Sequence, residues 1–379
     1  MNARRIVRSL FSIACAAIAL GSLSQRVHAA ASPSTARGSG PALIQLVAVQ
    51  MSFDLDDYWS RDAFAAKIRR LMQQVAREIQ PELPTLVVFP EDVGLMLVVQ
   101  GMRERLQGVE TIEEAIQRAV RAHLIPLAIT KWRRKLSWVP AFYLYRHRAI
   151  AETYFEVFSQ MAKEYGVYLV AGSAVLPPYR VQDGIVLWRQ GPVEHRVYNT
   201  AYLFGPDGKV VGKQDKVYLI ELEQEAALDL TSGDLDALRV FDTPLGRIGI
   251  AICLDAFQND VIERLVAQGA DILVQPSANP GPWSLDQQID WLRSSHQKTF
   301  VEKRFAYAVN PMMNGPLWDI AFYGQSSIVA RSPASLDSGE EAARLSYMHL
   351  VPTGGFLRVA SSDQSEEVLV ARVPHPASL

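Results

Sequence analysis

Cys253 stands at the end of an apolar run whose setting could make its thiol reactive. The run Ile248–Ile252 has no alternation and is too short for a typical helix, so it predicts a strand buried on both faces that ends at Cys253. A helix capped by Asn259 or Asp260 and a second buried strand, Asp271–Gln275, are expected to follow. In α/β proteins chemistry sits at such strand ends, where a helix N-terminus favours negative charge. Position alone leaves a thiolate nucleophile and a buried apolar cysteine equally open.

The cysteine content favours the reactive role. The chain of 379 residues has two cysteines, Cys15 and Cys253. Arginines at 4, 5 and 8, an apolar stretch Leu10–Leu23 and the small-residue site Val27–Ala29 predict a secretory signal peptide over residues 1–29. We therefore expect an exported protein, periplasmic or secreted, whose mature form keeps one thiol and needs a reason for it. A twin-arginine signal and a lipoprotein box at Cys15 stay open.

Two charged residues fit the same chemistry. Leu86–Pro90 predicts another buried strand that leads into Glu91, and Lys216 follows a predicted strand, turn and strand. With FPE at Glu91, DK-x-x-L at Lys216 and GIAICLD at Cys253, the chain resembles the nitrilase (carbon–nitrogen hydrolase) superfamily, from Leu43 to Arg372. A late G-x-S-x-I segment at residues 324–328 extends the resemblance. The three short motifs are individually weak, but their family order makes the signal strong.

The resemblance implies an α/β fold, a four-layer α-β-β-α sandwich that commonly dimerises, and a Glu-Lys-Cys triad. Glu91 would take the proton of Cys253, and the thiolate would attack an amide carbonyl to form a thioester. Lys216 and the backbone N–H of Leu254 would stabilise the oxyanion. Family members that act on nitriles generally carry Cys-Trp-Glu, whereas Cys-Leu-Asp at 253–255 resembles the amidase and carbamoylase branches. A small-molecule amide substrate is therefore expected.

The family also has a second carboxylate near the lysine. Glu221, Glu223 and Glu225 all qualify by position, and Glu223 has the preferred spacing from the lysine. Asn279 and Trp283, on the loop after the next strand, are candidate substrate-binding residues, although the tryptophan could equally belong to the core.

The remaining elements predict one domain over residues 43–374, after a flexible leader at 30–42 that is rich in Ser, Gly and Pro. Its expected parts are strand Leu43–Met51, helix Arg61–Ile79, helix Ile150–Tyr165, strand Val167–Val175, hairpins Tyr198–Lys213 and Leu238–Cys253, helix Leu285–Lys303, and strands Phe305–Asn310, Ser326–Ala330 and Val368–Val373. A site drawn from positions as distant as Glu91 and Cys253 argues for one domain. The order strand, helix, strand predicts crossover units.

Residues 95–149 form an insertion relative to the family. Thr111 and Glu114 predict a capping box, hence a helix. Residues 124–150 combine basic and aromatic side chains with no acidic residue. This composition suits peripheral contact with a membrane or a lid over the active site, and a cap packed on the core with a solvated basic rim is the simpler interpretation.

Other classes of function remain open. An N-acyltransferase could use the same acyl-enzyme, and a catalytically silent protein could keep the fold, although the complete triad argues against the latter. A Cys–His hydrolase would need one of the seven histidines as its base. The formal net charge of −2 and the absence of a metal-ligand or phosphate-binding motif predict no nucleic-acid partner, no metal and no cofactor.

Overall fold

The computed structural model describes residues 42–225, 227–332 and 354–379. The expected signal segment 1–29, Cys15 and the leader up to residue 41 lie outside the described residues. In the described part of the chain, no helix is both long and apolar enough to cross a membrane.

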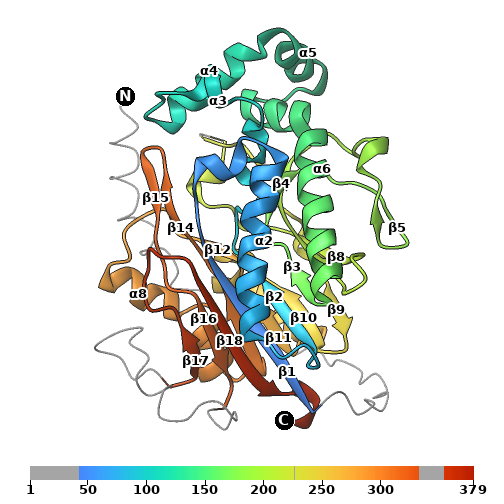
Figure 1. Cartoon of the computed structure of the whole chain (residues 1–379), viewed down its shortest axis with the longest axis vertical. Coiled ribbons are helices and arrows are strands. Elements are labelled where there is room, and N and C mark those ends of the chain that lie inside the picture. Colours follow the sequence, from blue (N-terminus) through green and yellow to red (C-terminus); the bar gives the residue numbers. More distant parts are fainter. Residues whose placement is uncertain (1–41, 226, 333–353) are drawn as a thin grey trace, which may run out of the picture. The chain divides into compact units, whose positions relative to one another are not determined.

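Two β-sheets form the centre of the described domain (Figure 1). The first runs in the order β12 (Ser277–Ala278), β14 (Met312–Leu317), β1 (Leu43–Ser52), β2 (Thr85–Val88), β3 (Tyr168–Val170), β7 (Tyr198–Phe204) and β4 (Ala174–Leu176), with β15 (Ile320–Phe322), β18 (Glu367–Pro374) and β8 (Val210–Asp215) paired to β14, β1 and β7. The second runs in the order β17 (Phe356–Val359), β16 (Ser327–Ala330), β13 (Tyr307–Asn310), β11 (Ile272–Val274), β10 (Gly246–Ile250) and β9 (Val240–Thr243). A separate hairpin pairs β5 (Val181–Gln182) with β6 (Ile185–Val186).

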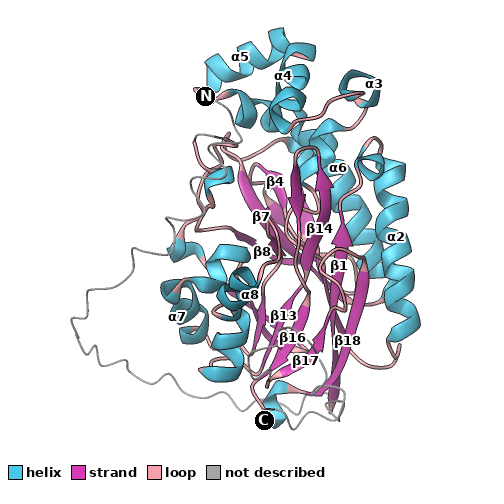
Figure 2. Ribbon diagram, turned by 90° about the vertical axis from the view of Figure 1, so that its left-hand side faces the viewer, coloured by secondary structure: helices cyan, strands magenta, loops and turns pink. Residues whose placement is uncertain are grey.

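Helices cover both sheets. Figure 2 shows α2 (Arg61–Glu78) and α6 (Trp138–Tyr165) on one side of the strands, and α7 (Asn259–Ala267) and α8 (Leu285–Leu292) on the other. Three further helices belong to the predicted insertion: α3 (Arg103–Leu106), α4 (Ile112–Ala122) and α5 (Leu124–Arg134).

Side-chain alternation in β1 explains the layers. Val47 and Val49 pack in a cluster with the apolar faces of α2 and α6. Leu46 and Ala48 point the opposite way and belong to the cluster formed by strands of the second sheet. The strand is buried on both faces because a helix layer lies on one side and a second sheet on the other. The expected α-β-β-α sandwich is confirmed.

Several expected elements are confirmed, with changes at their ends. Helix α2 begins at Arg61 as predicted, where the side chain of Ser60 caps it by accepting the N–H of Ala63, and the hairpin of β7 and β8 is present. Helix α6 also ends as predicted, with Gly166 in the left-handed region. It begins twelve residues earlier than the predicted Ile150, at Trp138, because Pro140 is acceptable in a first helical turn.

Other expected elements are wrong in detail. The strand predicted over Val167–Val175 is broken into β3 and β4 at Gly172, which has a φ of +55°. The helix predicted to reach Lys303 is interrupted after Leu292, where the hydroxyl of Ser294 hydrogen-bonds to the carbonyl of Trp291 and competes with the backbone. Helical structure resumes within the predicted range as a π-helix, Gln297–Val301. Neither Asn259 nor Asp260 caps α7, because the preceding Gln258 occupies the cap position.

Only half of the predicted capping box forms at α4. Thr111 accepts the N–H of Glu114 at 3.2 Å, which starts the helix. The carboxylate of Glu114 instead bonds to Arg118 one turn later at 2.6 Å. The helix itself is present where it was expected.

Candidate active site

Cys253 lies in a tight turn beyond the end of its strand. Strand β10 ends at Ile250, and Cys253 is the first residue of a short 3-10 helix, Cys253–Phe257. The prediction that the strand runs into Cys253 is therefore wrong by three residues. Cys253 has a φ of +48°, a left-handed conformation that costs free energy for a residue with a side chain. Its N–H donates to the carbonyl of Pro276 at 2.9 Å, which fixes this turn against the end of β11.

Glu91 follows β2 and is buried, with three hydrogen-bond donors around its carboxylate. Oε1 accepts from Nζ of Lys216 at 2.7 Å and from Nδ2 of Asn199 at 2.9 Å. Oε2 accepts the backbone N–H of Ala278 at 3.0 Å. The broken strand contributes here, because a Cβ at Gly172 would lie 1.9 Å from the carbonyl oxygen of Pro90. Only glycine lets β3 approach the Pro90–Glu91 backbone so closely.

Lys216 comes directly after β8, and its side chain is fully buried between two carboxylates. Nζ lies 2.7 Å from Oε1 of Glu91 and 2.6 Å from Oε2 of Glu223. Of the three candidate glutamates, the structure brings only Glu223 to the lysine, whereas Glu221 and Glu225 are exposed. Glu223 closes a short 3-10 turn and also accepts the N–H of Ile220 at 3.0 Å, which holds its carboxylate toward the lysine.

Sequence reasoning missed Asn199, which joins the two carboxylates. Its Nδ2 donates to Glu91 at 2.9 Å and to Glu223 at 2.7 Å. Its Oδ1 is buried and has no hydrogen-bond partner among the described residues. Turning the amide over would aim that oxygen at two carboxylates, so the network itself fixes the orientation. The available signal was an amide side chain within a strand, β7, whose residues are nearly all buried.

The thiol of Cys253 lies against the same group. Its Sγ is 3.8 Å from the carbonyl oxygen of Ala278, the residue whose N–H binds Glu91. Burial raises the pKa of Glu91, and the neighbouring Cys253 thiol is among the groups that lower it. The backbone N–H of Leu254 belongs to the first turn of the 3-10 helix, where N–H groups have no acceptor within the helix. It is thus free of the helix's own hydrogen bonds and available to an oxyanion.

Burial and the paired charges set the protonation states. Burial raises the pKa of Glu91, and Lys216 opposes the rise. Burial alone would lower the pKa of Lys216, but Glu91 and Glu223 outweigh it and raise that pKa well above its ordinary value. Burial and the charge of Glu91 raise the pKa of the Cys253 thiol well above its ordinary value. The resting thiol is therefore neutral, and ionisation requires Glu91 to accept its proton.

Asp255 was also missed, and it ties the cysteine turn to the lysine segment. Its buried carboxylate accepts the backbone N–H of Tyr218 at 2.8 Å and that of Val217 at 3.1 Å. These bonds hold the chain immediately after Lys216 against the 3-10 helix that begins at Cys253. Burial raises the pKa of Asp255 to about 7, and the two N–H groups lower it in part.

The two candidate substrate-binding residues do not join this hydrogen-bonded group. Nδ2 of Asn279 donates to the carbonyls of Gly281 and Tyr323, at 3.1 Å each. Trp283 packs edge-on against Trp291 in the core of the second sheet. Asn279 therefore shapes the loop after Ala278, and Trp283 has the core position that the sequence left open.

The described residues do not provide the groups that a Cys–His or a metal-based reaction would need. No histidine among them is bonded to Cys253, and within residues 42–225, 227–332 and 354–379 no cluster of His, Cys, Asp or Glu is arranged to hold a metal ion. The site combines a neutral thiol, a base, a buried cation and the N–H of Leu254, which no bond within the 3-10 helix occupies. Chemically, it can add a sulfur nucleophile to a carbonyl group and stabilise the resulting oxyanion.

Omega-amidases are among the known proteins that this chain is similar to. An omega-amidase of Xenopus laevis (NIT2-A) is 30% identical over 144 residues, which are 35% of this chain and 46% of that protein. The human omega-amidase NIT2 is 29% identical over 141 residues, which cover 34% and 45% of the two chains. The matched segments thus span about half the length of these relatives.

Solved structures share the fold. The crystal structure of a carbon–nitrogen hydrolase from Helicobacter pylori G27 has a TM-score of 0.55 at 19% identity, covering 89% of this chain and 90% of that one. Nit3 of Saccharomyces cerevisiae, a member of the nitrilase superfamily, has a TM-score of 0.54 at 17% identity, covering 91% and 95%. Residues 45–332 match the model of the carbon–nitrogen hydrolase family. The chain therefore belongs to the carbon–nitrogen hydrolase family.

Proposed function

We propose that this protein is an exported thiol hydrolase that cleaves a non-peptide amide or carbamoyl C–N bond. The observation that carries the proposal is the convergence of Glu91, Lys216 and Cys253, from three separate strand ends, in one buried group. Family membership supports the reaction class, and the names of the relatives, omega-amidases, support an amide substrate.

The proposed reaction begins when Glu91 takes the thiol proton and the sulfur of Cys253 adds to the carbonyl carbon. Lys216 and the N–H of Leu254 hold the oxyanion. When the tetrahedral species collapses, its C–N bond breaks and Glu91 gives the proton to the departing nitrogen, leaving a thioester. A water molecule then gives a proton to Glu91 and adds to the thioester carbonyl. Collapse of this second tetrahedral species releases the carboxylic acid, and the thiolate takes its proton back.

Two supporting groups would keep Glu91 a competent base. Lys216 and Asn199 both donate to its Oε1, and such bonds favour the ionised carboxylate. Glu223 balances the charge of the lysine, so that the cation stays in place while Glu91 passes between its charged and neutral forms. Export would follow from the signal-like composition of residues 1–29. An intact mass that retains Met1–Ala29 in protein from the native host would contradict that part.

The test is release of ammonia from a panel of primary amides, carbamoyl compounds and nitriles. Cys253→Ala is expected to abolish release from the amides or the carbamoyl compounds. Lys216→Ala should do so nearly as completely, whereas the matched control Lys213→Ala, on the same hairpin but paired with Asp215, should retain activity. Adding hydroxylamine should divert the thioester to a hydroxamate.

Three outcomes would overturn the proposal. Activity that survives Lys216→Ala but disappears with a histidine variant would indicate a Cys–His mechanism. Acyl transfer to an added amine, with no hydrolysis when the amine is absent, would indicate an N-acyltransferase. Silence on the whole panel, together with no acyl adduct on Cys253 by mass spectrometry, would indicate a binding protein.

A further inference from the structure

The insertion forms a helical cap that exposes an apolar face. Helix α5 packs on α4 and α6 through its inner side, where Leu127 is fully buried and His123, just before the helix, stacks on Phe142. The opposite side, here called the α5 outer face, is exposed. It consists of Leu124, Ile125, Ala128, Ile129 and Trp132.

These residues form a single stripe because they recur at helical spacing. At 3.6 residues per turn, they lie within an arc of about 140° on α5. The exposure is large for such side chains: Ile125 is 76% exposed and Trp132 is 81% exposed. Scattered exposed apolar residues need no explanation, but a contiguous stripe that includes a tryptophan indicates a contact surface.

The charged residues of α5 and of its C-cap are all positive. Lys131 and Arg133 lie at the two edges of the stripe by helical spacing, and Arg134 and Lys135 follow at its end. In the described structure, Arg133, Arg134 and Lys135 form no ion pair with any acidic side chain. Between Ala115 and Ala151 the sequence contains no acidic residue. The face therefore matches an anionic, partly apolar partner.

We propose that the α5 outer face lies on an anionic lipid surface, with Trp132 at the interface and the flanking basic side chains on phosphate groups. An amphipathic helix of this kind binds in the plane of the membrane, because its apolar face enters the headgroup boundary while the cations stay at the phosphates. Membrane binding through α5 does not depend on the catalytic activity proposed above. With 11 residues, α5 would lie on the membrane and not cross it.

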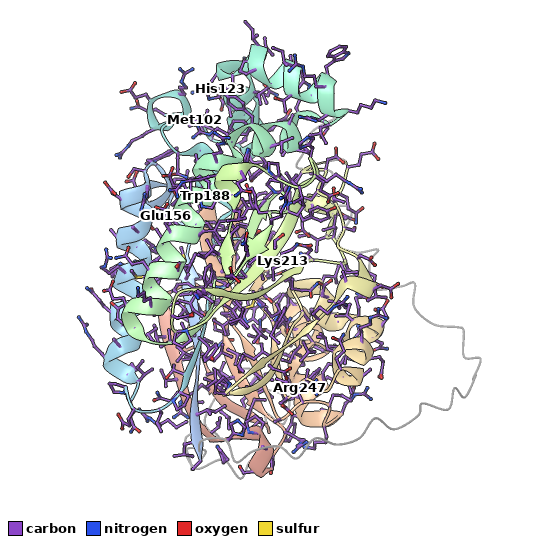
Figure 3. The ribbon with its side chains drawn as sticks, turned by 90° about the vertical axis from the view of Figure 1, so that its right-hand side faces the viewer. Met102, His123, Glu156, Trp188, Lys213 and Arg247 are labelled. Atoms are coloured by element: carbon purple, nitrogen blue, oxygen red, sulfur yellow. The ribbon has the colours of Figure 1, made fainter. Side chains whose placement is uncertain are left out.

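The cap is also connected to the residues that follow Glu91. The residues after Glu91 lead into the buried turn Leu95–Val99, which packs on α6. Tyr143 of α6 donates its hydroxyl to the carbonyl of Leu95 at 3.1 Å. Figure 3 shows His123 and Met102 together in the cap, with Lys213 of β8 on the sheet. A membrane-bound α5 would thus be connected through α6 to the segment that continues from Glu91.

The experiment uses the full chain with Cys15→Ser and Cys253→Ser and an environment-sensitive dye on a new cysteine, Ile129→Cys. The matched control is Ile289→Cys on α8, because Ile129 and Ile289 are similarly exposed, at 46% and 44%. Vesicles of phosphatidylcholine alone are compared with equal parts phosphatidylcholine and phosphatidylglycerol. The dye at position 129 should shift to the blue with anionic vesicles only, and the dye at 289 should not shift.

Unlabelled variants test the energetics by vesicle flotation. Ile129→Glu with Trp132→Glu should lower the partition coefficient onto anionic vesicles by at least about tenfold, whereas Ile289→Glu should leave it unchanged. High salt should weaken binding. Flotation without a dye shift at position 129 would assign membrane binding to another segment, such as Leu10–Leu23, and overturn the proposal. A shift without lipid that grows with protein concentration would assign the face to a second copy of the chain.

Discussion

Asn199 and Glu91 share a hydrogen bond of 2.9 Å between Nδ2 and Oε1, although they lie 108 residues apart in the chain. The other hydrogen of the same amide goes to Glu223 at 2.7 Å. One neutral side chain thus connects the two carboxylates that also share the Lys216 cation. The lysine supplies charge to this group, and the asparagine supplies alignment.

Replacing Asn199 with alanine should lower kcat/KM by roughly 10²-fold, because Glu91 loses a donor that favours its ionised form and fixes its rotamer. Losing that donor also raises the pKa of Glu91. The acidic limb of the pH–rate profile should therefore move to higher pH. The measurement is kcat/KM for an active amide across the pH range.

Thr200→Val is the matched control for Asn199. Thr200 is the next residue of β7, is also buried, and bonds to Asp215 on the opposite face of the strand. It should leave the acidic limb where it is in the unmodified protein. Equal shifts in both variants would mean that the change reflects damage to β7 rather than loss of the bond to Glu91.

Glu223→Gln should lower kcat/KM by about 10² to 10³, because Lys216 then loses one of its two carboxylate partners and the oxyanion loses a well-placed donor. Glu221→Gln and Glu225→Gln remove exposed carboxylates from the same short segment and should retain activity. Steady-state kinetics of the three variants make the comparison. Similar losses in all three would deny Glu223 a specific role.

The sequence predicted the three strand ends that meet in the site better than the groups between them. Periodicity and burial are local properties, so α2, β10 and the β7–β8 hairpin could be read from the residues. Asn199 and Asp255 bond across more than 20 residues to partners that no local pattern identifies. The break at Gly172 depends on the approach of Pro90, which is a tertiary contact.

The cap shows the same limit. Its helices and its basic, aromatic composition were evident, but composition could not decide which side chains face solvent. Packing of Leu127 against α6 determines that Trp132 and Ile129 point outward.

Cys253→Gly should unfold at a higher temperature than Cys253→Ala, although both should be inactive. At a φ of +48°, alanine bears a steric cost that glycine does not, about 1–2 kcal/mol. The greater entropy of the unfolded glycine chain reduces this advantage by about 0.5–1 kcal/mol. Thermal unfolding followed by circular dichroism compares the two variants. A higher midpoint for the alanine variant would mean that the turn relaxes once the thiol is gone.

Asp255 should make the folded state less stable as the pH rises. Burial raises its pKa to about 7 from an ordinary 3.8, so the folded state holds the proton more tightly than the unfolded state does. This contribution to stability is full below pH 3.8 and is lost as the pH rises to about 7, a difference on the order of 4 kcal/mol. Asp255→Asn should remove that part of the pH dependence.

The thermal midpoints of the unmodified protein and of Asp255→Asn, measured at pH 5 and pH 8, provide the test. At pH 8 the thermal midpoint of the variant should rise relative to that of the unmodified protein. The uncharged amide can still accept the N–H groups of Val217 and Tyr218, and it does not bury a charge. Asp236→Asn, which changes a carboxylate that is 80% exposed, should follow the unmodified protein at both pH values. A variant that loses stability at pH 8 would instead mean that the ionised carboxylate holds these N–H groups more strongly than burial penalises it.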